Sequence, residues 1–263
     1  MKPHGRTFGE VADLYDRVRP SYPKALVRDV LQFSGRQDPL VLEVGGGTGK
    51  ATALFAPHAR QVTVLEPDAS MAAVARRTCA ELKNVTIEET SFESWRPKSA
   101  QRWDLLISGQ AWHWVSPKVR CTRAMECLSP NGVLALFWYR QQWEDEAMHE
   151  ALQQVYTARA PDLVTRSFPG LKDATESRGA GWRTEIEISE GFENINEHSY
   201  ADQRPYIADD YLDLLRTQSD HHLLEKVKQR RLLEGVRNVV EATGGKVSVS
   251  FRFGLFLARR RSA

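Results

Sequence analysis

The chain has 263 residues, of which 27% are charged and 41% hydrophobic, and its formal net charge at pH 7 is +2. This composition excludes an intrinsically disordered chain and predicts one large globular domain, or one with a modest cap. The small net charge gives no general attraction to nucleic acid, and no apolar stretch approaches the length of a membrane span.

Two helices are predicted near the start of the chain. Apolar residues recur at helical spacing over residues 11–18, and two prolines interrupt the pattern before a second helix over 23–33. Tyr15 and Arg19 lie four residues apart, so they share one face of the first helix. A guanidinium there could bind a ligand carboxylate through two hydrogen bonds, although an arginine at a helix end is as often only solvated.

A glycine-rich turn follows these helices. Residues 41–49 read Val-Leu-Glu-Val-Gly-Gly-Gly-Thr-Gly. The apolar run predicts a buried strand over 40–45, and we expect a helix over 49–56 with Thr48 as its N-cap. Alternating glycines let the backbone turn sharply and let a ligand lie against the main chain.

Strands and helices continue to alternate after this turn. The next apolar run ends in Glu66, whose carboxylate is placed to bind ribose hydroxyls. We predict strands over 61–66, 84–88, 103–108 and 132–138, and helices over 69–82 and 117–127. Such alternation indicates a mainly parallel α/β sheet with right-handed crossovers, and the layout is that of a nucleoside site.

The pattern changes after residue 138. We predict a helix over 144–159, a loop-rich stretch over 160–183, strands over 184–188, 192–200 and 247–257, and a helical stretch over 209–242 broken near Ser219. His221 and His222 follow that break. They lack a third ligand at metal spacing, so we interpret them as solvent-facing or substrate-contacting residues and expect no metal site.

Three interpretations compete for the glycine-rich turn. A phosphate-binding P-loop is excluded, because Val44 stands where its first glycine belongs and Ala51 replaces its hydroxyl residue. A dinucleotide fingerprint that starts from Gly45 and Gly47 would place its third glycine at Lys50. The pattern Glu-x-Gly-x-Gly-x-Gly, with the acid inside the strand, fits at every position.

This third pattern resembles the first motif of class I S-adenosylmethionine-dependent methyltransferases, although Gly46 stands where that family often has Cys. Further segments are similar to the same family. They are the N-terminal stretch 8–23, the ribose motif 66–71, the adenine loop 90–93 and the stretch 108–114 after the fourth strand. Residues 215–247 resemble a small-molecule subgroup that contains trans-aconitate methyltransferase-like enzymes.

The resemblance implies a Rossmann-like seven-stranded sheet with helices on both faces, a small cap and a final antiparallel hairpin. It also implies S-adenosylmethionine as the cofactor. Together with the residue patterns, it marks these candidate cofactor-binding residues: Tyr15, Arg19, Glu43, Gly45, Gly46, Gly47, Gly49, Glu66, Pro67, Met71, Ser91, Phe92, Gln110 and Ala111. The glycines are expected beneath the methionine part and the ribose, and Met71 and Phe92 beside the adenine.

The stretch 110–114 is expected closest to the chemistry, which is an in-line displacement of a methyl group. Aromatic faces such as Trp112, Trp114 or Trp143 could stabilise a sulfonium, although most tryptophans are simply core residues. His113 could remove a proton from a hydroxyl or amine acceptor, but it could equally be structural. A carboxylate acceptor would need no base.

We therefore expect a cofactor-binding methyltransferase domain over 1–139 and 184–263, with the helices of 8–35 covering the pocket and 140–183 inserted as a lid that selects the substrate. The expected acceptor is a small molecule attacked through oxygen or nitrogen, and nucleic-acid and membrane partners are not expected. A nicotinamide-dependent oxidoreductase and a cofactor-binding protein with non-methylating chemistry stay open. Three cysteines without a Cys-x-x-Cys pattern favour a cytoplasmic protein, which we expect to be a monomer or homodimer.

Overall fold

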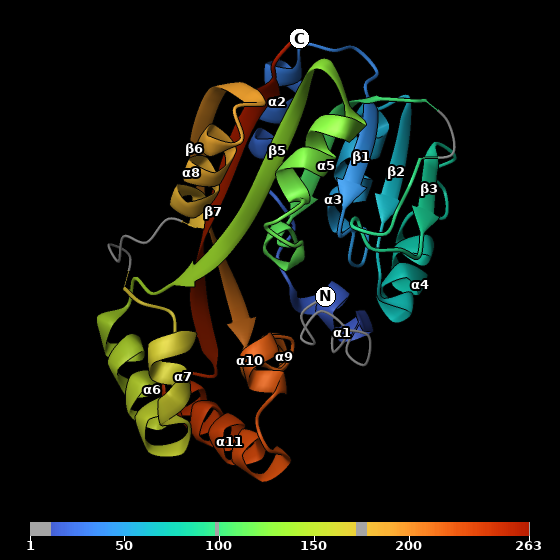
Figure 1. Cartoon of the computed structure of the whole chain (residues 1–263). Helices are drawn as coiled ribbons and strands as arrows, with labels where there is room; N and C mark the ends of the chain where they lie inside the picture. Colours follow the sequence, from blue (N-terminus) through green and yellow to red (C-terminus); the bar gives the residue numbers. More distant parts are fainter. Residues whose placement is uncertain (1–11, 98–99, 172–177, 263) are drawn as a thin grey trace.

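A seven-stranded mixed sheet organises the computed structural model, which describes residues 12–97, 100–171 and 178–262 (Figure 1). Residues 8–11 of the expected pocket cover and 172–177 of the expected lid lie outside the described residues. The strands are β1 (Leu40–Val44), β2 (Gln61–Leu65), β3 (Val85–Glu88), β4 (Trp103–Gly109), β5 (Leu128–Gln142), β6 (Phe192–Ile207) and β7 (Lys246–Arg260). Their spatial order is β3-β2-β1-β4-β5-β7-β6, with β1 to β5 parallel and β7 antiparallel to both β5 and β6.

Helices cover both faces of the sheet, which explains why its central strands are apolar along their whole length. In β1, Val41 packs on the face covered by α2 (Lys24–Ser34) and α3 (Lys50–Phe55), whereas Leu42 and Val44 belong to the opposite core. That second core contains residues of α5 (Arg120–Cys127) and α8 (Arg178–Ile188). The two cores hold the strand ends in register, so the loops after β1, β2 and β4 meet at one edge.

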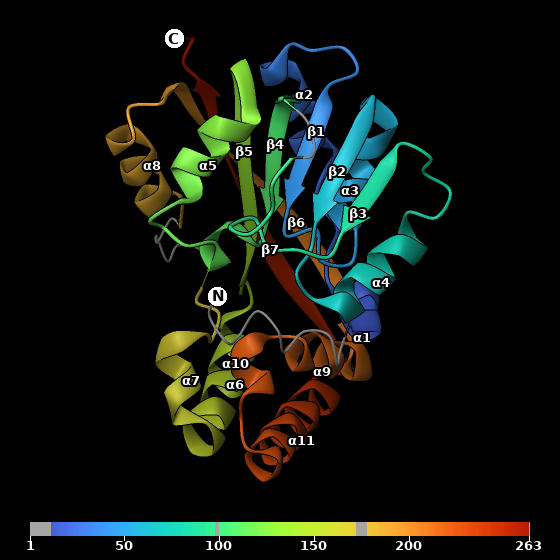
Figure 2. The ribbon, with the colours of Figure 1, turned by 45° about the vertical axis from the view of Figure 1, so that its right-hand side comes forward.

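A second group of helices lies beyond that edge. We name α6 (Glu146–Arg159), α7 (Pro161–Arg166), α9 (Ala208–Arg216), α10 (Ser219–His222) and α11 (Lys226–Ala242) the cap helices. They gather at one end of the molecule, where the long strands β5, β6 and β7 extend past the rest of the sheet (Figures 1 and 2). Two further helices, α1 (Ala12–Val18) and α4 (Ala69–Thr78), complete this side. The sheet edge and the cap therefore enclose a space between them.

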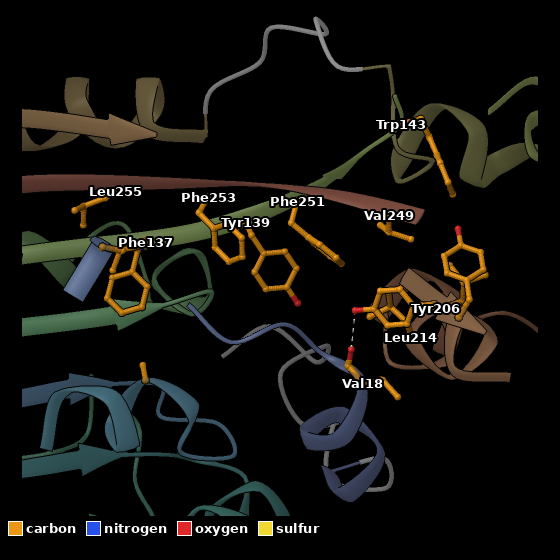
Figure 3. Packing of buried hydrophobic residues seen from close by; sticks show 14 of the residues in the cluster. Val18, Phe137, Tyr139, Trp143, Tyr206, Leu214, Val249, Phe251, Phe253 and Leu255 are labelled. Atoms are coloured by element: carbon orange, nitrogen blue, oxygen red, sulfur yellow. Dashed lines mark hydrogen bonds between the residues drawn. The ribbon is translucent and has the colours of Figure 1, made fainter. Parts of the chain in front are cut away.

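A row of aromatic residues joins the sheet core to the cap. Phe137 and Tyr139 of β5 lie beside Phe253 of β7, and the row continues through Phe251 (Figure 3). Beyond it, the Tyr206 hydroxyl donates a hydrogen bond of 3.1 Å to a backbone carbonyl oxygen at the end of α1. Sheet, cap and α1 are thus packed as one continuous core.

The fold confirms the predicted α/β sheet of seven strands, with two corrections. Residues 184–188, predicted as a strand, lie in helix α8. Their alternating pattern is short, and Trp182 and Ile186 at helical spacing are buried while Ile188 is 75% exposed. The stretch 160–183, predicted to be loop-rich, contains α7 and the beginning of α8. The last two strands are antiparallel as expected, and α9, α10 and α11 form the predicted helical stretch between them.

Among the described residues, no helix combines the length and the apolar character that crossing a bilayer requires.

Candidate functional site

A cavity of about 520 Å³ opens at the carboxyl ends of β1, β2 and β4, between the sheet edge and the cap helices. Open α/β sheets bind ligands at this position. The cavity brings together these residues proposed from the sequence: Tyr15, Arg19, Glu43, Gly45, Gly46, Gly47, Glu66, Pro67, Met71, Ser91, Phe92, Gln110, Ala111, His113 and Trp114. Three proposed residues, Gly49, Trp112 and Trp143, do not line it.

The turn after β1 follows its neighbours so closely that side chains are excluded. A Cβ on Gly45 would lie 2.2 Å from the Ala111 Cβ, and one on Gly46 would lie 2.2 Å from Val64 Cγ1. Gly45 also has a φ of +73°, in the left-handed region that favours glycine. The turn is therefore pressed between the ends of β2 and β4, with its backbone facing the cavity.

Gly49 serves the helix rather than the cavity. It is the N-cap of α3 with a φ of +86°, and an added Cβ would lie 3.3 Å from Ala75 Cα in α4. Thr48, expected as the cap, makes no capping bond. Its hydroxyl oxygen is instead buried in the cavity wall without a hydrogen-bond partner among the described residues. An unpartnered buried hydroxyl is costly unless a ligand or water satisfies it, so this wall suits a polar ligand.

Two buried carboxyl groups line the same end of the cavity. Glu66 accepts hydrogen bonds of 2.8 Å from the backbone N–H of both Gly47 and Asp68, which orient its two oxygens. Glu43 accepts a bond of 2.6 Å from the Thr52 hydroxyl. Burial raises the pKa of Glu43 to about 8 and that of Glu66 to about 7, although these hydrogen bonds act in the opposite direction.

Arg19 joins α1 to the sheet and the cap. Its guanidinium donates to the Tyr139 hydroxyl at 2.8 Å, and to the hydroxyl and carbonyl oxygens of Thr217 at 2.8 and 2.9 Å. It also stacks on the Tyr15 ring at 4.8 Å. These bonds use three of its five N–H groups, and no described carboxylate forms an ion pair with it. The side chain is held in place with donors left for a ligand.

Another part of the cavity wall is more apolar. Met71 and Phe92 are buried and line it together with Ser91. Met71 packs in a small cluster with Ala12 and Val74, and the Phe92 ring lies 6.1 Å from a tryptophan of the next turn. Two apolar side chains beside a hydroxyl suit a flat, partly polar ring.

The stretch after β4 forms a short 3-10 helix, Trp112–Trp114. Gln110 precedes this helix and has a φ of +56°. Its side-chain amide donates a hydrogen bond of 3.0 Å to the Tyr139 carbonyl oxygen. His113 and Trp114 line the cavity. Trp112 is only 1% exposed and packs in the core, and its carbonyl oxygen accepts a bond from Arg120 at 3.0 Å. Trp112 therefore supports the turn and does not face a ligand.

Three segments of the cavity wall contain no residue that was marked in advance as a site residue, although most of them fall within the predicted lid over 140–183. They are residues 139–142 at the end of β5, 166–171 after α7 and 218–220 at α10, and we name them the distal part. Arg140 is half-buried and Arg166 is exposed, and neither side chain has a hydrogen bond or ion pair among the described residues. Phe168 completes this wall against Tyr156, with ring centroids 4.7 Å apart. No local motif marks these segments.

His221 of α10 differs from the sequence-based interpretation, whereas His222 is partly exposed. His221 is 1% exposed, does not line the cavity and hydrogen-bonds the Tyr156 hydroxyl at 2.7 Å. Burial lowers its pKa to about 3, so it is a neutral core residue. Within the described ranges, no three His, Cys, Asp or Glu side chains are grouped as metal ligands. Trp143, another aromatic candidate, is also buried outside the cavity.

Comparison with known proteins bears on this geometry. Residues 41–132 match the family model described as a methyltransferase domain. A probable S-adenosylmethionine-dependent methyltransferase of Saccharomyces cerevisiae is 30% identical over 148 residues, which cover 54% of this chain and 50% of that protein. The trans-aconitate 2-methyltransferase of Deinococcus radiodurans is 35% identical over 97 residues, 36% of each chain. The match spans about half the length of the first of these relatives.

A solved structure shows the same fold. A proposed type II methyltransferase from Anaeromyxobacter dehalogenans superposes with a TM-score of 0.65, at 18% identity, covering 93% of this chain and 99% of that one. Together these matches support the class I S-adenosylmethionine-dependent methyltransferases as the family that this chain resembles. The resemblance inferred from the glycine-rich turn is thereby confirmed, and the nicotinamide alternative loses its support. The cofactor of this methyltransferase family is S-adenosylmethionine.

Proposed function

We propose that this methyltransferase transfers a methyl group from S-adenosylmethionine to an oxygen or nitrogen atom of a small acidic molecule. The observation that carries the proposal is the continuity of one cavity, which joins the glycine-rich turn to a distal part bearing Arg140 and Arg166. A cofactor held at the turn would present its methyl group toward those arginines.

The proximal residues fit the cofactor's chemistry. Glu66 would accept hydrogen bonds from ribose hydroxyls, because each oxygen that binds a backbone N–H has a further lone pair. Met71 and Phe92 would enclose the adenine, and the spare N–H groups of Arg19 would bind the carboxylate of the methionine part. The unpartnered Thr48 hydroxyl gives independent support for a polar ligand here.

The distal part fits a negatively charged acceptor. Its charged residues are Arg140, Arg166 and Asp220, and neither arginine is neutralised by a described carboxylate. Two guanidinium groups can bind carboxylate or phosphate oxygens in pairs of hydrogen bonds. The Phe168 ring would cover an apolar portion of the same molecule.

When bound, S-adenosylmethionine supplies an electrophilic methyl carbon, which the acceptor atom attacks in line while the sulfur keeps the electron pair of the breaking bond. The chain's task is to align and desolvate the acceptor, and positioning of this kind is worth roughly 7–11 kcal/mol. A carboxylate acceptor is already deprotonated. For a hydroxyl or amine acceptor, His113 is the side chain in the cavity wall proposed to take the proton.

We also propose that residues 140–183 act as the substrate-selecting lid. Arg140, Arg166 and Phe168 all come from this segment, which supports the assignment. The reduced, buried state of Cys79, Cys121 and Cys127 supports a cytoplasmic location. A small-molecule substrate and a monomeric or homodimeric state complete the proposal.

The first test is calorimetry with the purified chain, followed by transfer of an isotope-labelled methyl group. Binding of S-adenosylmethionine and S-adenosylhomocysteine, without binding of NAD or NADP, is expected. Labelled product should form with members of a panel of small carboxylic and phosphorylated acids rather than with their uncharged amides or esters. Cofactor binding without transfer to any acceptor class would instead favour non-methylating chemistry.

The second test uses Arg140→Gln and Arg166→Gln with the best acidic acceptor of that panel. Each loses a charged hydrogen bond worth about 1.5–3 kcal/mol, so the acceptor KM should rise roughly 10- to 100-fold while the cofactor Kd stays unchanged. Arg231→Gln, on α11 outside this cavity, is the matched control. Unchanged KM in both variants would contradict an acidic acceptor and the lid assignment together.

A further inference from the structure

We propose that the Tyr22 hydroxyl contacts the positively charged sulfur centre of the bound cofactor and so distinguishes S-adenosylmethionine from its demethylated product. This inference rests on the proposed function. Tyr22 lines the cavity and lies in the N-terminal stretch 8–23, but it was not among the candidate site residues marked from the sequence. It lies in the connection between α1 and α2, which brings it to the edge of the sheet.

The Tyr22 ring is fixed by the aromatic row of the sheet. It packs edge-on against Phe137 with centroids 4.6 Å apart and against Phe253 at 6.2 Å. Both partners are fully buried strand residues, which leaves the ring little freedom. Its hydroxyl therefore has a set position, as a group that recognises one atom of a ligand requires.

That position is the carboxyl end of β4. A Cβ on Gly109, the last residue of β4, would lie 2.6 Å from the Tyr22 hydroxyl oxygen and 2.5 Å from a Phe137 ring carbon. Glycine at this site thus makes room for the phenol. β4 pairs with β1, and the Gly45 turn that follows β1 touches Ala111 just beyond β4. The hydroxyl thus lies at the end of β4, the strand next to β1 at the point where the sheet order reverses, while its ring packs on β5 and β7.

The cofactor's sulfur is expected at the same place. With the adenine beside Phe92 and the ribose at Glu66, the adenosyl group occupies the ends of β3 and β2. The sulfur is joined to the ribose by one methylene group, so it comes next along the edge, over the turn after β1. The phenol oxygen lies beside Gly109 at the end of β4, and Tyr22 lines the same cavity as that turn.

The chemistry of the hydroxyl suits a cation. Among the described residues it has no hydrogen-bond partner, and burial raises the pKa of Tyr22 well above its ordinary value, so the group stays neutral. A neutral oxygen offers lone pairs to a positive centre. The thioether of the product carries no charge and gains much less from the same contact.

The test is calorimetry with Tyr22→Phe, which removes the oxygen and keeps the ring. The affinity for S-adenosylmethionine should fall about 5- to 10-fold, because hydrogen-bond-type contacts to charged groups are worth more than neutral ones. The affinity for S-adenosylhomocysteine should change less than twofold. No acceptor is needed, so the result does not depend on knowing the substrate.

Tyr206→Phe is the matched control. It removes a buried hydroxyl that bonds the Val18 carbonyl oxygen outside the cavity (Figure 3), and both affinities should stay unchanged. Equal losses for the two ligands in Tyr22→Phe, or no loss for either, would overturn the inference. Failure of the unaltered chain to bind either ligand would instead overturn the proposed function.

Discussion

Gly45 and Ala111 lie in close contact in the cavity wall. They come from the turns after β1 and β4, and only the absence of a side chain at Gly45 lets the two turns meet. The neighbouring Gly47 has a φ of +56° but open space around its Cα. Glycine is therefore required at position 45 both for the contact with Ala111 and for the left-handed backbone conformation. At position 47 it is required for the backbone conformation alone.

Gly45→Ala should consequently be the more damaging substitution. A left-handed alanine costs about 1–3 kcal/mol, and the clash with Ala111 adds a similar amount, so we expect a loss of roughly 2–5 kcal/mol in unfolding free energy. Gly47→Ala should lose about 1–2 kcal/mol, the conformational part only. Urea denaturation of both variants measures the difference.

The double variant Gly45→Ala with Ala111→Gly separates the two causes. Removing the Ala111 methyl group should restore the part of the stability that the clash removed. If the double variant is no more stable than Gly45→Ala, the contact between the turns does not limit the site.

The carboxyl groups of Glu43 and Glu66 make stability depend on pH. In the unfolded chain they ionise near pH 4.5, but burial raises their pKa to about 8 and about 7 in the folded protein. Between these values the folded state holds protons that the unfolded state has released. Their contribution to stability is thus present at low pH and is lost as the pH rises toward 8.

Glu43→Gln should remove the larger part of this dependence. The amide retains an acceptor for Thr52 but cannot ionise. Relative to the unaltered protein, the variant should gain stability as the pH rises from about 5.5 to about 8.5. Urea midpoints at the two pH values test this. A constant difference between the proteins would mean that Glu43 is ionised throughout the range.

At the scale of elements, α8 shows how a helix can support the site from a distance. Glu185 of α8 forms an ion pair with Arg120, which is almost fully buried and also donates to the Trp112 carbonyl oxygen. This chain of bonds connects α8 and α5 to the turn that carries His113. The turn's position thus depends on a helix that contributes no residue to the cavity.

Glu185→Gln tests this connection. It leaves the buried Arg120 charge without its partner, and we expect a loss of roughly 2–4 kcal/mol in unfolding free energy. Glu187→Gln on the same helix is the control. That side chain is 52% exposed and pairs with Arg183 on the surface, so the loss should be at most about 0.5 kcal/mol. Equal effects would show that the Arg120 pair has no special role.

At the scale of the whole molecule, the long strands β5, β6 and β7 create the cavity. They continue beyond the edge at which β1, β2 and β4 end, and the cap helices pack on the extension (Figures 1 and 2). The part of the cavity around the glycine-rich turn is therefore bounded by the sheet, and the distal part is bounded by the cap.

The sheet and the cavity wall around the glycine-rich turn could be predicted because their sequence signals are local. Strand periodicity, glycine at a sharp turn and an acid at a strand end depend on neighbours a few residues apart, and Gly45 and Glu66 were both identified this way. The segment 184–188 shows the limit of such signals. Its five alternating residues do not distinguish a strand from a helix, and packing of Trp182 and Ile186 against the sheet selects the helix.

The distal part of the cavity could not be found in the same way. Arg140, Phe168 and Asp220 lie far apart in the chain and carry no shared pattern, and they meet because the cap folds back onto an extended β5. Trp112 and His221 illustrate the converse, since residues with suitable chemistry became core. Local backbone preference determines which elements form and where the glycine-rich turn that can hold a nucleoside lies in the chain. Long-range packing determines which side chains face the ligand, because burial depends on neighbours that no local stretch contains.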